Sequence, residues 1–332
     1  MSLLRNINTR ARTSINTGFG DDAGSYGGRF LNKSGQANIQ KSGLRFFEKY
    51  SWFHSMLAMT WLQFFLTILA FYILVNIVFA FIYYAIGVEH LSGMRTASEA
   101  EKFGEAFFFS AQTFTTVGYG RISPTGFATS AIAAFQALVG LLSFAVATGL
   151  MYGRFSKPTA YLKFSDNALV SPFQNVNALM LRVAPFKNAT LTDAEAKLTL
   201  AIMVEENGVM VNRFFPLDLQ FDKVNALTLS WTIVHPIIET SPLYHFIKED
   251  FKNSPGEVIV YLKAFDDMFS NTVVARTSYT FNEIIYGAKF TPMFHRNKEK
   301  SATILDVSRI NDHQKVLLYN DLEESQRLKV KT

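Results

Sequence analysis

The sequence contains no cysteine and only six histidines among its 332 residues. Without thiols the chain forms no disulfide, holds no thiolate zinc site and has no cysteine nucleophile. The histidines lack the spacing of metal ligands, and no P-loop, nucleophile elbow or paired-carboxylate motif is present. We therefore expect a protein that is not an enzyme and that needs no cofactor.

Charge is missing from two long stretches, 56–88 and 127–151, which contain no Asp, Glu, Lys or Arg. A membrane span needs about 20 apolar residues, so these stretches predict transmembrane helices over about 56–86 and 127–153. Lys and Arg gather before the first stretch and just after the second, whereas the segment between them is acidic. The positive-inside rule then places both termini in the cytoplasm.

The net charge of +5 fits such basic flanks, and because no nucleic-acid motif is present we expect no nucleic-acid partner. Residues 1–43 are rich in Gly, Ser and Asn, which predicts a disordered arm. Residues 44–55 mix aromatic and charged side chains, which favours a short amphipathic helix in the membrane interface over a simple polar end of the first span. Within that span, Gln63 and Asn76 could bond across helices.

The stretch TTVGYG, residues 115–120, lies between the two spans. Its glycines permit backbone conformations that are costly for other residues, so a strand here can turn successive carbonyl oxygens toward one axis. Four copies around that axis could replace the water shell of a potassium ion. The apolar residues before it are too few to cross the bilayer, which predicts a re-entrant helix. Helix and filter together take up 104–120, with Glu105 in the first turn, where an anion is favourable. The alternative is a Gly-rich turn between two spans.

The second span is rich in small residues that allow close helix contact. Gly149, near its inner end, is either a bend or a packing residue. From residue 157 onward, short runs of β-forming residues are separated by turn signals, of which Asn207-Gly208 is a hairpin signal. The pattern predicts an immunoglobulin-like β-sandwich over 157–298, followed by a charged, partly mobile tail over 299–332. The runs are 178–183, 197–204, 209–215, 227–234, 257–265 and 272–281.

Four segments together resemble one family: AFFFS (106–110) leading into the Gly-rich strand, RFSKP (154–158), SWTIVHPI (230–237) and NEIIYG (282–287). The chain is similar to the inward-rectifier potassium channels, and within them to the prokaryotic KirBac branch, over about residues 45–294. The resemblance implies a membrane α plus all-β fold. A pore domain over 56–156, with two transmembrane helices and a re-entrant pore helix, precedes a cytoplasmic immunoglobulin-like β-sandwich.

The resemblance also implies a homotetramer in the bacterial inner membrane, with one central pore and potassium as the permeant ion. A selectivity filter would use Thr116, Val117, Gly118, Tyr119 and Gly120, with potassium held at the first four. Bulky apolar rings in the inner part of the second span would form a gate that closes by dewetting, and the segment 268–273 a second constriction in the cytoplasm. The implied gate residues are Phe144, Tyr152, Ser270 and Asn271; the alternative for Phe144 is lipid or helix packing.

Anionic lipid is the further partner that the resemblance implies. Arg45 and Lys49 of the interfacial helix, with Arg154 and Lys157 after the second span, would bind it; the alternative is that these side chains only orient the helix. Phe144 stands where strong rectifiers carry an acidic side chain, so the resemblance does not extend to strong polyamine block.

Three further positions depart from the family pattern. They are Gln112, Arg213 and the pair Thr159-Ala160, which stand where relatives carry Glu, an acidic residue and basic residues. Because Thr159 and Ala160 stand where phosphoinositide-activated relatives are basic, an activating response to phosphoinositide of the eukaryotic type is not implied. Two other function classes remain: a membrane-anchored binding protein with a vestigial pore, and a less selective cation channel.

Overall fold

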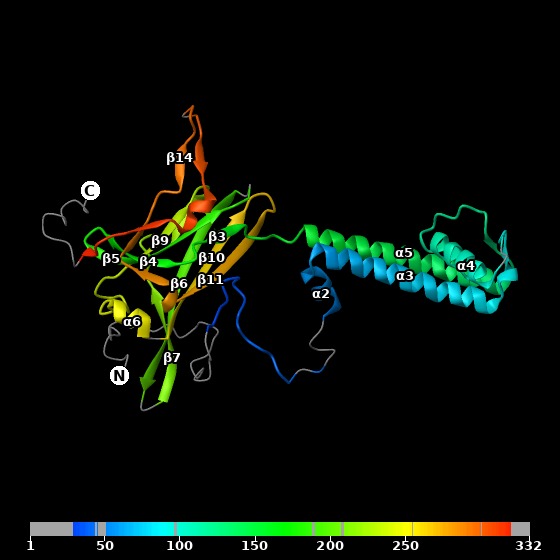
Figure 1. Ribbon diagram of the computed structural model, residues 1–332, viewed down its shortest axis with the longest axis horizontal. Coiled ribbons are helices and arrows are strands. Elements are labelled where there is room, and N and C mark those ends of the chain that lie inside the picture. Colours follow the sequence, from blue (N-terminus) through cyan, green and yellow to red (C-terminus); the bar gives the residue numbers. More distant parts are fainter. Residues whose placement is uncertain are drawn as a thin grey trace. The chain divides into compact units, whose positions relative to one another are not determined.

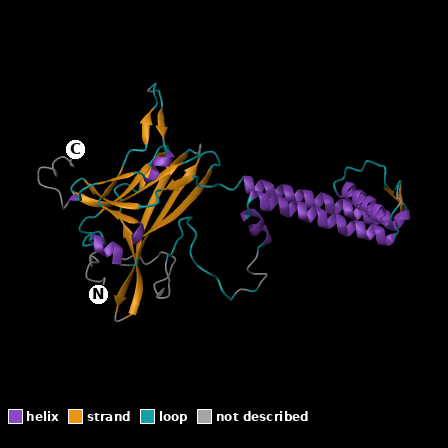
Figure 2. Ribbon diagram, in the orientation of Figure 1, coloured by secondary structure: helices purple, strands orange, loops and turns teal. Residues whose placement is uncertain are grey.

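The structure is a computed structural model, and it describes residues 29–43, 45, 51–95, 98–187, 190–206, 209–253, 255–299 and 301–319. The chain divides into two compact units. The helical unit comprises Lys41–Lys157, and the β unit comprises Met1–Gln40 together with Pro158–Thr332. Figure 2 shows the difference in character, with helices dominating the first unit and strands the second.

The helical unit contains two helices, among the residues that the structure describes, that are long and apolar enough to cross a membrane. They have mean hydropathies of 2.6 and 2.0, and only 17% and 11% of their most apolar windows is buried. Most of their surface therefore needs lipid or another chain to cover it. The helices of this unit are α2 (Trp52–Ala58), α3 (Trp61–Ile86), α4 (Glu99–Phe114) and α5 (Phe127–Phe155). The two predicted spans correspond to α3 and α5.

The starts of α3 and α4 are set by capping boxes. Thr60 and Gln63 bond reciprocally at the start of α3, which therefore begins at Trp61 rather than at 56. The prediction that Gln63 could bond across helices is wrong, because its side chain caps its own helix. Ser98 and Glu101 do the same for α4, which begins at Glu99 rather than at 104. Glu105 consequently lies in the second turn, not in the first as expected.

Helix α2 covers part of the predicted interfacial helix. Residues 44 and 46–50 lie outside the described residues, so the first half of that prediction is not addressed. Ser51 caps α2 by accepting a hydrogen bond from the backbone of His54. The helix runs to Ala58, three residues past the predicted end at 55.

The β unit consists mainly of two five-stranded sheets. One has the order β11-β10-β6-β7, with β8 paired to β6; the other has the order β12-β4-β5-β3, with β9 paired to β5 (Figure 1). Small two-stranded pairs, β13 with β16 and β14 with β15, complete the unit. The strands are β3 (Leu162–Phe164), β4 (Ala168–Phe173), β5 (Val176–Pro185), β6 (Leu191–Glu206), β7 (Val209–Leu217), β8 (Lys223–Leu227), β9 (Trp231–Pro236), β10 (Gly256–Asp266), β11 (Asn271–Thr280), β12 (Ile284–Tyr286), β13 (Ala288–Phe290), β14 (Phe294–Arg296), β15 (Thr303–Leu305) and β16 (His313–Lys315).

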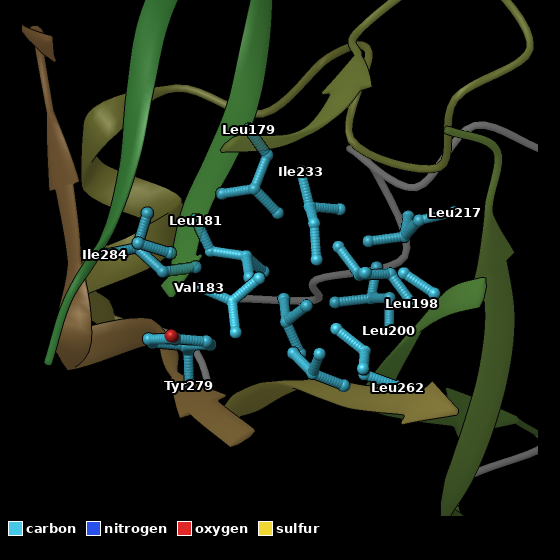
Figure 3. Close-up of a cluster of buried hydrophobic side chains, with 14 of the residues drawn as sticks. Leu179, Leu181, Val183, Leu198, Leu200, Leu217, Ile233, Leu262, Tyr279 and Ile284 are labelled. Atoms are coloured by element: carbon cyan, nitrogen blue, oxygen red, sulfur yellow. The ribbon is translucent and has the colours of Figure 1, made fainter. Parts of the chain in front are cut away.

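The core of the β unit lies between the two large sheets. Both faces of β5 are buried: Leu179, Leu181 and Val183 belong to the main core, whereas Ala178 and Met180, on the opposite face, belong to a separate cluster. Figure 3 shows the first three side chains facing residues of the other sheet, including Leu200 on β6 and Leu262 on β10. The expected β-sandwich is therefore confirmed.

The sequence located six strands but missed others. The predicted run 227–234 covers most of β9 but only the last residue of β8, and a bend at 228–229 lies between the two strands. Glu206 pairs with Val209, as a hairpin requires, although Asn207 and Gly208 themselves lie outside the described residues. Strands β3, β4 and β12–β16 are too short, or too poor in β-forming residues, to be recognised by pattern.

The prediction of a disordered arm over 1–43 is wrong for residues 29–38, here called the strap. Phe30 and Leu31 are buried against Ala201, Phe214 and Ile259. Residues 1–28 lie outside the described residues.

The prediction of a partly mobile tail is likewise wrong for 301–319. That stretch contributes β15, β16 and two buried side chains, Ile310 and Leu318. In both segments the buried residues are a few isolated apolar side chains within polar sequence. They form no repeating hydrophobic pattern from which a strand or helix could be predicted.

Candidate ion-conduction site

The Gly-rich strand begins where α4 ends. Thr116, Gly118 and Gly120 have φ of 57°, 53° and 82°, whereas Val117 and Tyr119 between them lie outside the positive-φ region. Successive carbonyl groups of an ordinary strand point to opposite sides. Alternation between left- and right-handed residues instead lets them point to one side, which is the arrangement that a row of cation ligands requires.

The inner end of this strand is attached to the last turn of α4. The backbone N–H of Thr116 donates to Thr113 O at 3.1 Å, and that of Val117 donates to Gln112 O at 3.0 Å. Thr116 is β-branched and sits at positive φ, a conformation that is a genuine outlier for such a residue. These hydrogen bonds hold the strained residue in place.

The strand is otherwise uncovered by its own chain. Val117 and Tyr119 are 52% and 79% exposed. A Cβ built on Gly118 or on Gly120 would meet nothing within 4 Å among the described residues. Irregular backbone at membrane depth is tolerated only where it is buried in protein or lines a water-filled path, and the described part of the single chain does not bury this strand.

Helix α5 passes against the end of α4 at Gly140. A Cβ at this position would overlap the carbonyl oxygen of Phe114 and lie 2.8 Å from its carbonyl carbon. Only glycine allows this approach. The contact sets the position of the residue that directly precedes the filter stretch 115–120.

A buried polar network connects the three long helices behind the strand. Gln136 of α5 donates to the Oγ of Ser110 on α4 at 2.6 Å and accepts from the Tyr83 hydroxyl on α3 at 2.7 Å. Ser110 in turn donates to Asn76 Oδ1 on α3 at 2.8 Å. All four side chains are buried.

This network confirms the prediction that Asn76 bonds across helices. Sequence reasoning missed Gln136 and Ser110. The signal was available: Gln136 is a large amide in a charge-free span, and such a group must find partners inside the protein.

The predicted gate residues lie in two separate units. Phe144 and Tyr152 are both on α5, with 73% and 74% of their surface exposed within the single chain. Ser270 and Asn271 are at the turn that joins β10 to β11 in the β unit, where Ser270 has a φ of 46°. The single chain leaves both rings of α5 free to face a pore axis or lipid.

Arg154, predicted to bind lipid, is engaged inside the helical unit. Its Nη1 donates to Met56 O at 2.5 Å and its Nη2 to Met59 O at 2.7 Å, and its guanidinium lies 4.7 Å from the ring centroids of Trp61 and Phe64. It thereby caps the open C-terminal end of α2. These bonds favour the alternative, that Arg154 orients helix α2, over direct contact of Arg154 with lipid. Lys49 lies outside the described residues.

Two of the segments that carry the family resemblance are structural elements of the β unit. His235 of SWTIVHPI bonds Asp218 O through Nδ1 at 2.6 Å and Ser241 Oγ through Nε2 at 2.8 Å. Burial lowers its pKa, against the opposing effect of Asp218. The ring is therefore a neutral bridge between two loops.

Glu283 of NEIIYG ties the strap to the sandwich. Its carboxylate accepts from both terminal nitrogens of Arg29, at 3.1 and 2.9 Å, and from the Thr280 N–H at 2.9 Å. Burial acts to raise the pKa of Glu283, but the Arg29 and Thr280 hydrogen bonds outweigh it and the pKa is lowered. Glu257, buried on β10, accepts from the backbone N–H groups of Phe30 and Leu31.

No group of three or more His, Asp or Glu side chains that could hold a metal ion occurs within the described ranges. The candidate cation ligands are thus the backbone carbonyls of 116–119. The sequence identified this stretch because its string of residues is specific. The structure was needed to show the hydrogen bonds from Thr116 and Val117 to the end of α4 that hold it in place.

Comparison with known proteins supports this assignment of elements. A family model for the inward rectifier potassium channel C-terminal domain matches residues 162–328, and an ion channel model matches residues 58–157. The inward rectifier potassium channel Kirbac3.1 of Paramagnetospirillum magnetotacticum is 35% identical over 271 residues, which cover 80% of this chain and 89% of that protein.

A human relative matches at lower identity. The ATP-sensitive inward rectifier potassium channel 12 of Homo sapiens is 30% identical over 293 residues, covering 82% of this chain and 68% of that protein. Among solved structures, the sporulation control protein Spo0M of Bacillus subtilis covers 39% of this chain and 50% of its own, with a TM-score of 0.24 and 11% identity.

Proposed function

Because the chain belongs to the inward-rectifier potassium channel family, whose members are tetrameric membrane channels and not enzymes, we propose that four copies surround one axis and conduct potassium passively along residues 116–120. The observation that carries the proposal is the strand itself. Its residues alternate between left-handed and right-handed backbone conformations, and no other part of its own chain that the structure describes covers Gly118 or Gly120. A strand of this kind needs identical neighbours to cover it and to complete an ion's coordination.

Backbone carbonyls of Thr116, Val117, Gly118 and Tyr119 hold potassium in this proposal, and Gly120 ends the row. The ion is the permeant species, and no cofactor takes part. Potassium is distinguished from sodium by the number and field strength of the carbonyl groups that coordinate the ion, and by the width of the filter.

The inner gate is a ring formed by Phe144 from each copy, with Tyr152 two turns further along α5. Exposure of both rings within the single chain supports this role. Apolar rings close a pore by expelling its water. Ser270 and Asn271 line a second constriction in the cytoplasm, where the positive φ of Ser270 gives a tight turn. Since Phe144 is uncharged, strong block by polyamines is not expected.

Anionic lipid is the proposed modulator, with the protein in a bacterial inner membrane and both termini in the cytoplasm. The basic segments on the cytoplasmic side of the spans support this orientation. Lys157, Arg45 and Lys49 are the proposed contacts, at about 1 kcal/mol for each basic side chain near an anionic surface. Arg154 acts through α2 instead.

The test is uptake of rubidium into liposomes that hold the purified protein, with barium as blocker and sodium as competitor. Uptake that barium abolishes, potassium suppresses and sodium leaves unchanged is the expected result. Absence of uptake from intact tetramers in both neutral and anionic liposomes contradicts the proposal and favours a vestigial pore. Equal suppression by sodium and potassium indicates a less selective channel.

Gly118→Ala provides the matched filter variant. Its φ of 53° costs a residue with a β-carbon about 1–2 kcal/mol in each of four subunits. Because nothing within one chain crowds Gly118, the expected damage comes from this backbone angle rather than from a clash. Gly104→Ala on α4 is the control, since that glycine has ordinary φ and open space around it. Flux and selectivity that survive Gly118→Ala would mean that the filter lies elsewhere.

A further inference from the structure

The outer end of the filter stretch is fastened to the rest of the chain at three points. Arg121 follows Gly120 directly, and its Nη2 donates to Glu105 Oε2 on α4 at 2.5 Å. The Glu105 side chain is mostly buried, at 19% exposure, and that of Arg121 is 45% exposed. The first residue past the filter is therefore bonded back to the helix that leads into it.

The second attachment is a short antiparallel ladder. Strand β1 (Leu91–Ser92) lies in the linker before α4, and β2 (Ser123–Pro124) follows the filter. Thr125 N also donates to His90 O at 2.8 Å. Between filter and ladder, the Ile122 side chain is buried in a cluster with Leu91 and other residues of α3 and α4. The linkers on either side of α4 are thus joined outside the filter.

The third attachment is a close backbone approach. Gly93 has a φ of 88°, and a Cβ on it would overlap the carbonyl oxygen of Arg121 and lie 3.0 Å from its carbonyl carbon. Only glycine meets both conditions. The Arg121 peptide is therefore fixed from the linker side while its side chain is fixed from the helix side.

We propose that Glu105, Arg121 and Gly93 form a clamp that positions the outer end of the filter and keeps it conducting when few potassium ions occupy it. Between this clamp and the hydrogen bonds at Thr116 and Val117, the strand has no covering contact at Gly118 or Gly120 among the described residues. It is a strand held at both ends with positive-φ residues between them. Releasing one end lets the backbone leave those angles, because the described part of its own chain offers no other restraint, and the filter then depends more strongly on bound ions.

The proposal rests on the proposed function, because it concerns the same conduction path. The measurement is the rate at which rubidium or potassium flux is lost when external potassium is lowered, using the full-length tetramer in liposomes or planar bilayers. Glu105→Gln removes the charge while preserving shape. A partly exposed ion pair contributes about two- to fivefold to an equilibrium constant. Since four subunits share one filter, a factor of about two in each multiplies to more than tenfold, and we expect flux at low potassium to decay at least about tenfold faster, with little change at high potassium.

Glu99→Gln is the matched control. Glu99 is on the same helix and pairs with Lys102 at 2.6 Å, but this pair does not touch the filter linker. Gly93→Ala tests the clamp through its backbone contact and should shift the decay in the same direction. The exchanged variant Glu105→Arg with Arg121→Glu should recover part of the loss if the two side chains act as a pair.

The outcomes separate this inference from the function on which it rests. If the native chain takes up no rubidium, the proposed function fails first. If the native chain conducts and tetramers of Glu105→Gln and Gly93→Ala lose flux no faster than Glu99→Gln at low potassium, the clamp is refuted. A uniform drop in conductance at all potassium concentrations also refutes it, because that result indicates a charge effect on ion entry rather than positioning.

Discussion

Gly140→Ala tests the packing that supports the filter from behind. The added Cβ would overlap the Phe114 carbonyl oxygen, with the carbonyl carbon at 2.8 Å and Cα at 3.1 Å, so all three obstacles are backbone atoms. Because they cannot rotate away, α5 and the end of α4 must separate. Overpacking of this kind costs about 1–3 kcal/mol per site. Alanine recovers about 1 kcal/mol through its better helix propensity, which leaves a net loss of up to about 2 kcal/mol in each subunit.

In the proposed tetramer this effect is multiplied, because four such contacts are present. We expect a loss of up to about 8 kcal/mol in tetramer stability, seen as a lower temperature of tetramer dissociation in detergent. The shift of Phe114 also displaces Thr115 and Thr116, so potassium selectivity should fall in the tetramers that remain.

Gly149→Ala on the same helix is the control, because a Cβ there meets nothing within 4 Å in the described chain. It should be neutral or slightly stabilising. A Gly140→Ala tetramer as stable and as selective as this control would refute the close-contact reasoning. Altered gating in Gly149→Ala, with normal stability, would favour the bend over the packing role for that glycine.

Three other changes have defined outcomes. Phe144→Ala should raise resting rubidium flux several-fold by widening the proposed gate; unchanged flux from an intact tetramer removes Phe144 from that gate. Gln136→Leu should cost about 1–3 kcal/mol per subunit, because the buried Tyr83 hydroxyl and the Ser110 hydroxyl each lose a partner; thermal dissociation as in the native chain would contradict the network. Lowering pH should release the strap. The lowered pKa of Glu283 gives stability that is fully present above the ordinary glutamate pKa of about 4.3 and is lost as pH falls through the folded value. Amide exchange at 29–38 should then rise below about pH 4; exchange that is the same at pH 3 and pH 7, after correction for intrinsic rates, would exclude this linkage.

The elements that the sequence predicted well are those with a long or specific signal. Two charge-free stretches of membrane length predicted α3 and α5, and the TTVGYG string predicted a strand with unusual backbone angles. Boundaries were less accurate because single caps decide them. Thr60 and Ser98 moved the starts of two helices by five residues each, relative to the predicted 56 and 104.

The supporting contacts could not be predicted because each depends on residues far apart in the sequence. The strap is one case: Phe30 and Leu31 bond to Glu257, more than 220 residues later. Arg154 is another. Its position after a span favours a lipid contact, yet the two carbonyls that it binds belong to residues 95 and 98 positions earlier. A cation at a helix end has several possible partners, and only the fold selects among them.

The strap makes the β unit a domain of two separate pieces, with the whole helical unit inserted between them in the sequence. During synthesis the strap leaves the ribosome first, but Phe214, Glu257 and Glu283 are made only after both membrane helices. The β-sandwich therefore completes its fold only once the membrane segments have been synthesised. A fragment that begins at Pro158 would keep both sheets but leave the Glu257 carboxylate without the two N–H groups that it bonds, and would expose the face of Phe214 that Phe30 covers.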